Sequence, residues 1–151
     1  MKLNTRSRYA VMALVDLASS EGQGCSELTS LKTMAARQDL SVTYLEQLFA
    51  KLRRKGLVRS MRGVNGGYAL AKPAAEISIG HVVDALDDAV KMTRCKGNGT
   101  KGTGCLPHGA LCKTHHLWAT LEQHIKKQLD TMTLASCLET DVHTSATRDS
   151  A

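Results

Sequence analysis

A glycine-rich stretch with three cysteines and a histidine constrains this chain more than any other feature. The four residues are Cys95, Cys105, Cys112 and His115. They lie in a segment with little hydrophobic periodicity, so an apolar core of its own cannot order it. Thiolate and imidazole side chains select zinc or iron-sulfur clusters rather than magnesium or calcium. The sequence therefore predicts that a metal centre orders this segment.

The spacing of these ligands bears on the kind of metal. Structural zinc sites usually bring their cysteines in close Cys-x-x-Cys pairs, whereas the spacers here hold nine, six and two residues. This pattern favours an iron-sulfur cluster, with zinc as the alternative. A disulfide is disfavoured, because five cysteines without a secretory signal indicate the reducing cytoplasm. His116 and His108 are alternatives to His115 as the fourth ligand.

Positive charge is concentrated in the N-terminal half. Residues 1–72 hold 12 Lys and Arg against 5 Asp and Glu, whereas residues 73–151 hold 8 against 9. Such a basic half fits a surface that binds a polyanion, and by charge alone it fits a solvated surface equally well. The longest apolar run, residues 9–15, is far shorter than the roughly 20 residues of a membrane span. We therefore expect a soluble protein without a membrane partner.

Hydrophobic spacing predicts a mainly α fold with a small β-hairpin wing. The expected elements are helices over residues 5–19, 26–38 and 42–55 and strands over residues 57–62 and 68–72. A helix-turn-helix followed by a hairpin is a winged helix, and this assigns residues 1–73 to a DNA-binding domain. Ser41 is expected to cap the third helix.

The C-terminal half is expected to add two helices around the cysteine loop. A linking helix over residues 74–91 precedes the cluster-binding loop at 92–115, and a long helix follows over 116–134. That helix carries one narrow apolar stripe, which needs a partner helix and predicts a dimer. The stripe residues are Trp118, Leu121, Ile125, Leu129 and Met132. Residues 135–151 are polar and patternless, so we expect a disordered tail.

The third predicted helix has the side chains of a DNA-reading helix. The N-terminal part of such a helix reaches base edges in the major groove. Gln47 can bind adenine, Thr43 can contact a thymine methyl group, and Glu46 can accept from a cytosine amino group. The DNA-binding residues predicted from helix and hairpin are Ser41, Thr43, Tyr44, Glu46, Gln47, Lys51, Arg54, Arg59, Arg62, Asn65 and Gly66.

Basic side chains at the end of this helix and along the hairpin supply charge for the phosphate backbone. The glycine-rich turn allows a close approach to that backbone, and Arg62 at its root is placed for a minor groove. Nothing in the sequence supplies an acid-base pair or an activated nucleophile, so neither an enzyme nor a small-molecule substrate is expected.

Five motifs together resemble a known family. They are TRSRYAV at residues 5–11, SVTYLEQLF at 41–49, VRSMRGVNGGY at 58–68, TRC at 93–95 and CKTH at 112–115. The chain resembles the IscR family of bacterial iron-sulfur cluster regulators from Met1 to about Leu134. The resemblance implies a homodimeric winged-helix transcription factor that binds promoter DNA as an activator or repressor. It also implies control of genes for iron-sulfur cluster assembly.

The resemblance also assigns residues to roles. It implies a 2Fe-2S cluster on the three cysteines and His115, base reading by Thr43, Glu46 and Gln47, and a minor-groove contact by Arg62. The spacer before Cys105 is longer than the family pattern. Some relatives that sense nitric oxide or iron add a carboxylate ligand from the first helix, where this chain has Arg8. A nitric-oxide- or iron-sensing regulator with a 4Fe-4S cluster, or a zinc-stabilised DNA-binding protein, is the alternative.

Overall fold

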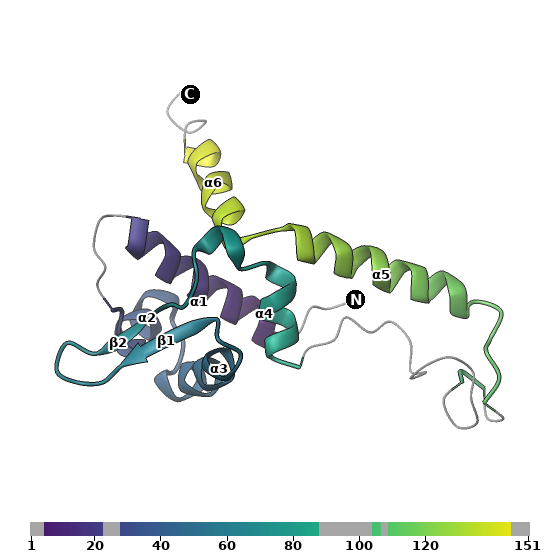
Figure 1. Ribbon diagram of the computed structural model, residues 1–151, viewed down its shortest axis with the longest axis horizontal. Coiled ribbons are helices and arrows are strands. Elements are labelled where there is room, and N and C mark those ends of the chain that lie inside the picture. Colours follow the sequence, from purple (N-terminus) through teal and green to yellow (C-terminus); the bar gives the residue numbers. More distant parts are fainter. Residues whose placement is uncertain (1–4, 23–27, 88–103, 107–108, 146–151) are drawn as a thin grey trace.

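The computed structural model describes residues 5–22, 28–87, 104–106 and 109–145 (Figure 1). The helices are α1 Thr5–Gly22, α2 Leu31–Gln38, α3 Val42–Arg54, α4 Ile79–Ala85, α5 His115–Thr131 and α6 Leu134–Ser145, the strands are β1 Val58–Met61 and β2 Gly67–Leu70, and η1 Ala74–Glu76 is a 3-10 turn. The predicted fold class, mainly helical with a hairpin wing, is confirmed. None of the helices in the described part of the chain has the length and apolar character that a bilayer span requires.

The core forms where α1 packs against α2, α3, α4 and the hairpin. α1 contributes Leu14 and Leu17, which are 0% and 1% exposed, together with small alanines that let its neighbours approach closely. α3 contributes Leu45, Leu48, Phe49 and Leu52, as its spacing predicts. The Phe49 ring meets Tyr68 of β2 edge-on at 4.9 Å between centroids. Burying each large apolar side chain stabilises the fold by about 1.5–3 kcal/mol, which holds α3 firmly beneath the hairpin.

The hairpin is antiparallel and extends by one residue to the segment before α2. Val58 lies opposite Leu70, and Met61 lies opposite Gly67. Thr29 and Tyr68 exchange two backbone hydrogen bonds of 2.9 Å. Gly67 permits this pairing, because a Cβ there would lie 2.7 Å from the Thr29 carbonyl oxygen. The predicted start of the second helix, at residue 26, was therefore too early.

α2 begins at Leu31 rather than near Ser26, because the chain before it is used in the sheet. Ser30 caps the helix, and its Oγ accepts from the Thr33 backbone N–H at 3.1 Å. Ser26 lies outside the described residues. By contrast, Ser41 caps α3 as expected, since its Oγ accepts from the Tyr44 N–H at 3.1 Å.

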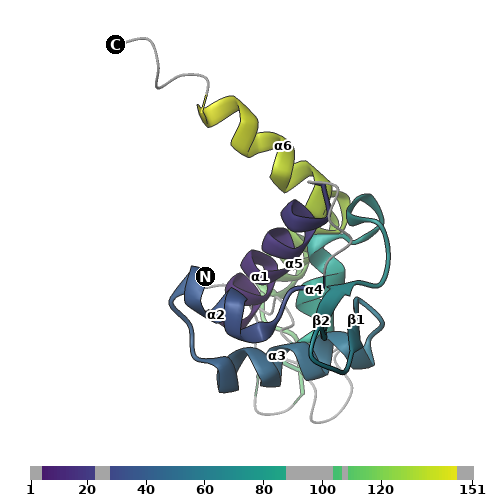
Figure 2. The same ribbon diagram turned by 90° about the vertical axis from the view of Figure 1, so that its left-hand side faces the viewer.

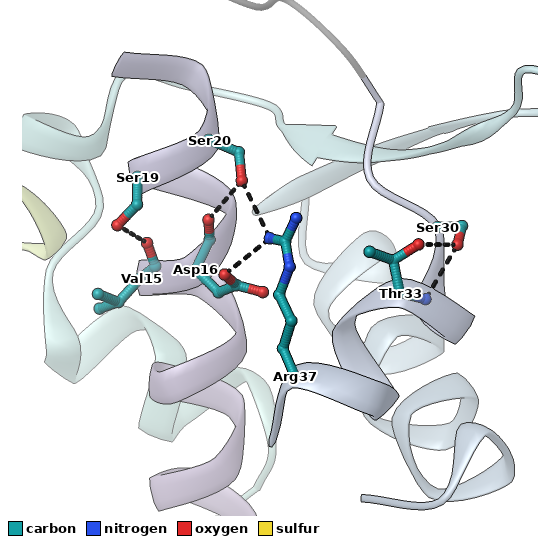
Figure 3. Close-up of polar contacts among 7 residues, drawn as sticks. All are labelled: Val15, Asp16, Ser19, Ser20, Ser30, Thr33 and Arg37. Atoms are coloured by element: carbon teal, nitrogen blue, oxygen red, sulfur yellow. Dashed lines mark hydrogen bonds and ion pairs between the residues drawn. The ribbon is translucent and has the colours of Figure 1, made fainter. Parts of the chain in front are cut away.

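A polar contact fixes α2 against α1 (Figure 3). The Arg37 guanidinium of α2 donates to Asp16 Oδ1 of α1 at 3.0 Å and to Ser20 Oγ at 3.5 Å. Ser20 in turn donates to the Asp16 carbonyl at 3.0 Å. The second carboxylate oxygen of Asp16 is buried, with no hydrogen-bond partner among the residues that the structure describes. Arg37 is therefore the polar partner of a carboxylate that is largely removed from water.

A short β-bridge joins the start of α4 to the joint between α5 and α6. Ser78 pairs with Thr133, the Ile79 N–H donates to the Met132 carbonyl at 2.8 Å, and the Leu134 N–H donates to the Ile77 carbonyl at 3.0 Å. Gly80 lies directly against Asp130 at this point. From this anchored end, α5 extends away from the helical body (Figure 1).

The C-terminal segment is helical, which corrects the expectation of a disordered tail over residues 135–151. α6 runs to Ser145 and packs against α1. Leu134 is 0% exposed, and Cys137 and Leu138 pack against the core. Thr133 and Ser136 cap the helix reciprocally through hydrogen bonds of 3.1 and 3.2 Å. Residues 146–151 lie outside the described part.

Candidate nucleic-acid interface and metal ligands

The outward face of α3 presents polar side chains at the surface of the body. Thr43, Glu46 and Gln47 are all exposed, whereas the apolar residues between them are buried. α3 and the hairpin lie on the same side of the molecule, away from α6 (Figures 1 and 2). The packing of α3 thus leaves the three predicted base-reading side chains accessible to a partner.

Tyr44 is the least accessible of the side chains predicted at the start of α3. It is half-buried and packs against the core. Its ring meets Tyr9 of α1 edge-on, with centroids 6.0 Å apart. Offset and edge-on aromatic pairs add to the stability gained by burial. The Tyr44 ring therefore packs the N-terminal end of α3 against α1.

The predicted basic residues differ in what they contact. Arg54 and Arg62 are exposed. Arg59 Nε donates to the Leu70 carbonyl across the hairpin at 3.3 Å. Lys51 instead contacts the C-terminal end of α4, where its Nζ lies 3.1 Å from Asp87 Oδ2. Arg53, which the predicted site does not include, donates to Ser60 Oγ at 3.2 Å. These contacts make Arg54 and Arg62 the basic side chains with the most freedom to meet a partner.

The tip of the hairpin is a tight, exposed turn. The Gly66 N–H donates to the Gly63 carbonyl at 3.0 Å, and Gly63 adopts a φ of 128°. That backbone conformation favours glycine strongly over residues with a Cβ. Asn65 and Val64 project from the turn, and Val64 is fully exposed. Val64 was not among the predicted site residues, although an apolar residue in the centre of a glycine-rich turn is a usable signal.

Of the four predicted metal ligands, three lie in the described part of the chain, and Cys95 lies outside it. Cys105 Sγ and His115 Nδ1 are 3.2 Å apart. Cys112 and His115 flank the start of α5, where the His115 N–H donates to the Cys112 carbonyl at 3.0 Å. The described residues include no group of three His, Cys, Asp or Glu already arranged to hold a metal ion. Their pairwise contacts nonetheless bring soft donors together at one end of α5.

Hydrogen bonds at Cys112 affect the acidity of its thiol. The pKa of its thiol is lowered, first by the hydrogen bond with the Thr114 hydroxyl and then by that with Cys105. The Cys112 Sγ and Thr114 Oγ1 atoms are 3.4 Å apart. Thiolate rather than thiol is the form that binds metals. The donor set therefore fits a thiophilic metal or an iron-sulfur cluster.

The fourth-ligand alternatives differ in their surroundings. His116 is exposed, and its ring meets that of His115 edge-on with centroids 5.5 Å apart. His115 is half-buried and already lies against Cys105. His108 lies outside the described residues. The described contacts therefore favour His115 over His116.

Much of the predicted apolar stripe on α5 is uncovered. Trp118, Leu121 and Met132 are 40%, 38% and 42% exposed, and the neighbouring Leu117 is 62% exposed. Ile125 and Leu129 are half-buried. A groove of about 380 Å³ also separates α5 from α4, lined by residues that include Val83, Ala119 and Leu129. α5 thus carries an apolar surface that the described part of its chain leaves exposed.

Comparisons with known proteins agree with this architecture. Residues 3–140 match the family model Rrf2, described as an iron-dependent transcriptional regulator. An HTH-type transcriptional regulator of Neisseria meningitidis serogroup A is 45% identical over 139 residues, covering 92% of this chain and 88% of the relative. The HTH-type transcriptional regulator IscR of Serratia proteamaculans is 44% identical over 135 residues, covering 89% of this chain and 77% of the relative.

A solved structure gives the same result in three dimensions. The structure of T. potens IscR matches with a TM-score of 0.71 and 35% sequence identity, covering 93% of this chain and 88% of that one. These relatives are regulators of transcription rather than enzymes. The chain therefore belongs to the Rrf2 family and is an IscR-like, winged-helix transcriptional regulator.

Proposed function

We propose that this protein is a cytoplasmic homodimer that senses iron-sulfur cluster status and controls genes for iron-sulfur cluster assembly. The observation that carries the proposal is the pairing of two features in one chain. An exposed polar face on α3 can read duplex promoter DNA, and thiol and imidazole donors meet at the free end of α5. The Rrf2 match and the IscR relatives support both halves.

DNA recognition would divide between α3 and the wing. Thr43, Glu46 and Gln47 would contact base edges, because they are exposed near the start of a helix that can enter a major groove. Arg62 would enter the minor groove beside the turn. The remaining proposed contacts, mainly to phosphates and sugars, are Ser41, Tyr44, Arg54, Arg59, Asn65 and Gly66. The basic N-terminal half supplies the charge that attracts the duplex.

The ligands proposed for a 2Fe-2S cluster are Cys95, Cys105, Cys112 and His115. Such a cluster supplies reversible redox chemistry and iron that can be lost, and its histidine ligation raises the potential. The hydrogen bond with Thr114 lowers the pKa of the Cys112 thiol, which favours the thiolate form that binds metals. His115 would contribute an imidazole nitrogen as the fourth ligand. Gly104 leaves room for the loop backbone, since a Cβ there would meet the Gly109 carbonyl.

DNA binding is tested on the full-length protein, purified without oxygen, with duplexes enriched from a random-sequence pool. We expect Arg54→Ala and Arg62→Ala to weaken binding, each by about 1–3 kcal/mol if its contact is to a base and by less if it is to a phosphate. Lys127→Ala on α5 is the control, because it removes an exposed charge remote from α3. If no sequence is enriched, or if both arginine variants bind as the wild type does, the proposed DNA-reading surface is wrong.

The cluster is tested by absorption spectroscopy with iron, sulfide and zinc determinations on the same protein. We expect a coloured sample with two irons per chain, and loss of iron in Cys95→Ala, Cys105→Ala, Cys112→Ala and His115→Ala. Cys137→Ala is the matched control, because Cys137 packs near the core on α6 rather than at the start of α5. A colourless protein with stoichiometric zinc would support the zinc alternative, and four irons per chain would support the 4Fe-4S alternative.

A further inference from the structure

Lys51 differs from the other predicted DNA contacts in the described part of the molecule, because its ammonium group donates hydrogen bonds to two acceptors. Its Nζ donates to Asp87 Oδ2 at 3.1 Å and to the Leu86 carbonyl at 3.4 Å. Its side chain is 33% exposed, whereas neighbouring Arg53 and Arg54 are exposed. α4 runs toward α3 and ends beside it, so this contact joins the last turn of α3 to the residues that end α4 (Figure 1).

The end of α4 is shaped to receive an ammonium group. Leu86 is the C-cap residue, and its side chain is buried at 1% exposure, so its carbonyl is held in place by core packing. Asp87 follows with a φ of 58°, in the left-handed region, which ends the helix and presents its carboxylate beside α3. Carbonyls at a helix C-terminus lack intrahelical partners and favour nearby cations. Lys51 supplies that cation.

Charge around Asp87 strengthens the same contact. The pKa of the Asp87 carboxyl is lowered from its ordinary value, first by the hydrogen bond from Lys51 and then by the Lys51 charge. Lys55 and Arg54 add to the effect from the same end of α3. Asp87 therefore faces the basic end of α3. Its carboxylate binds the Lys51 ammonium group, which is then less available to other anions such as phosphate.

Arg54 provides the contrast that gives Lys51 a separate role. Arg54 is exposed and makes no hydrogen bond or ion pair within the described part of the chain. A guanidinium in that position is available to phosphate, whereas binding of phosphate by Lys51 would first break two existing contacts. The two residues lie three apart and so share a side of α3, yet Lys51 bonds to the end of α4 and Arg54 makes no such bond in the described part of the chain.

We propose that Lys51 is a positioning residue, which sets the orientation of α3 by binding the Leu86–Asp87 end of α4 and does not itself contact DNA. This inference rests on the proposed DNA binding and revises the role predicted for one residue. The orientation of α3 decides whether its side chains meet base edges together, so loss of the contact affects specific binding more than general attraction to the duplex.

The experiment compares variants of the full-length protein on the enriched duplex and on a scrambled duplex, each over a series of salt concentrations. Lys51→Met keeps most of the apolar stem and removes the ammonium, and Lys51→Arg restores a cation that can reach both acceptors. Asp87→Asn removes the carboxylate charge, and Lys51→Met/Asp87→Asn completes a double-mutant cycle. Arg54→Met is the matched control on the same helix.

We expect Lys51→Met to weaken binding to the enriched duplex by about two- to fivefold, as suits a partly exposed pair. Binding to the scrambled duplex and the slope of affinity against salt should not change, and Lys51→Arg should recover the loss. The double variant should bind no more weakly than Lys51→Met. Arg54→Met should weaken binding to both duplexes and reduce the salt slope by about one.

The proposal is overturned if Lys51→Met behaves as Arg54→Met does, with a smaller salt slope and equal losses on both duplexes. Unchanged binding to the enriched duplex, or fully additive losses in the cycle, would overturn it as well. Thermal unfolding of each variant shows whether a loss of binding reflects global unfolding. If the wild type selects no sequence, the proposed function itself fails, which is a separate result.

Discussion

At the scale of single residues, Asp16 shows how strongly one polar side chain can depend on one partner. Its side chain is 22% exposed, with Oδ1 paired to Arg37 and Oδ2 buried without a partner among the described residues. A buried charge is costly unless it is paired. Arg37 is 50% exposed, so solvent screens part of the interaction. The contact therefore places α2 against α1 at a modest gain in stability.

We predict that Arg37→Met lowers the free energy of unfolding by about 1 kcal/mol, because it leaves Asp16 without its cation. Urea unfolding followed by circular dichroism measures the change. Arg54→Met is the control, and its effect should stay within about 0.5 kcal/mol, since Arg54 is exposed and makes no such contact in the described part. Equal stabilities of the two variants would contradict the prediction.

At the scale of elements, α5 carries an exposed apolar surface of the kind that helices bury when they associate. Its apolar side chains lie along one side and are partly exposed, while Lys126 on another side pairs with Asp84 of α4 at 2.8 Å. The polar pair holds α5 to its own chain, and the apolar side remains open. A second copy of the same helix would cover it, because each copy offers the same surface in an isologous contact.

We predict that Trp118→Lys combined with Leu121→Lys converts a dimer into a monomer, because charges placed in an apolar interface are costly to bury. Sedimentation velocity over a concentration series measures the state. Thr120→Lys, an exposed polar position on the same helix, should leave the dimer intact. A wild type that sediments as a monomer at all concentrations would remove the proposed interface.

Helices whose signals are local were predictable from the sequence, and those that depend on distant contacts were less so. α3 has its cap, its apolar spacing and its terminal glycine within one segment, and all three are confirmed. The start of α2 depends on Thr29 pairing with Tyr68, which lies far along the chain. α6 was not predicted because it has few apolar residues: Leu134, Cys137 and Leu138. These residues pack against the core beside α1, and that contact cannot be read from the local sequence.

At the scale of the whole molecule, the DNA-reading surface and the proposed cluster ligands lie on different elements. α3 belongs to the helical body, whereas Cys112 and His115 lie at the end of α5 that extends from it (Figure 1). Any influence of one on the other must pass through packed elements. α4 is placed for this, because it contacts α5 along one side and α3 at its end.

We predict that the iron-loaded and iron-free forms differ in affinity for the enriched duplex by about 1–3 kcal/mol, the usual size of a coupling between sites. Fluorescence anisotropy on both forms, without oxygen, measures it. His115→Ala should bind as the iron-free form does under both conditions. Equal affinities and equal sequence preference in the two forms would rule out a switch.

The candidate site was predictable from the sequence to different degrees. An amphipathic helix fixes its exposed face, so Thr43, Glu46 and Gln47 could be placed correctly on the surface. Spacing could not reveal that Lys51 points to Asp87, because that contact depends on where α4 ends. The three described ligand candidates were chosen by their chemistry, and the contact between Cys105 and His115 required the fold of the loop.

The bridge between Ser78 and Thr133 anchors one end of α5. A 17-residue helix is about 25 Å long, so a turn of about 10° at the joint moves its far end by about 4 Å. The same joint holds the first residues of α4. Substitutions there, at Gly80 or Asp130, could therefore alter how the two ends of the molecule communicate while leaving every DNA-contacting and iron-binding side chain intact.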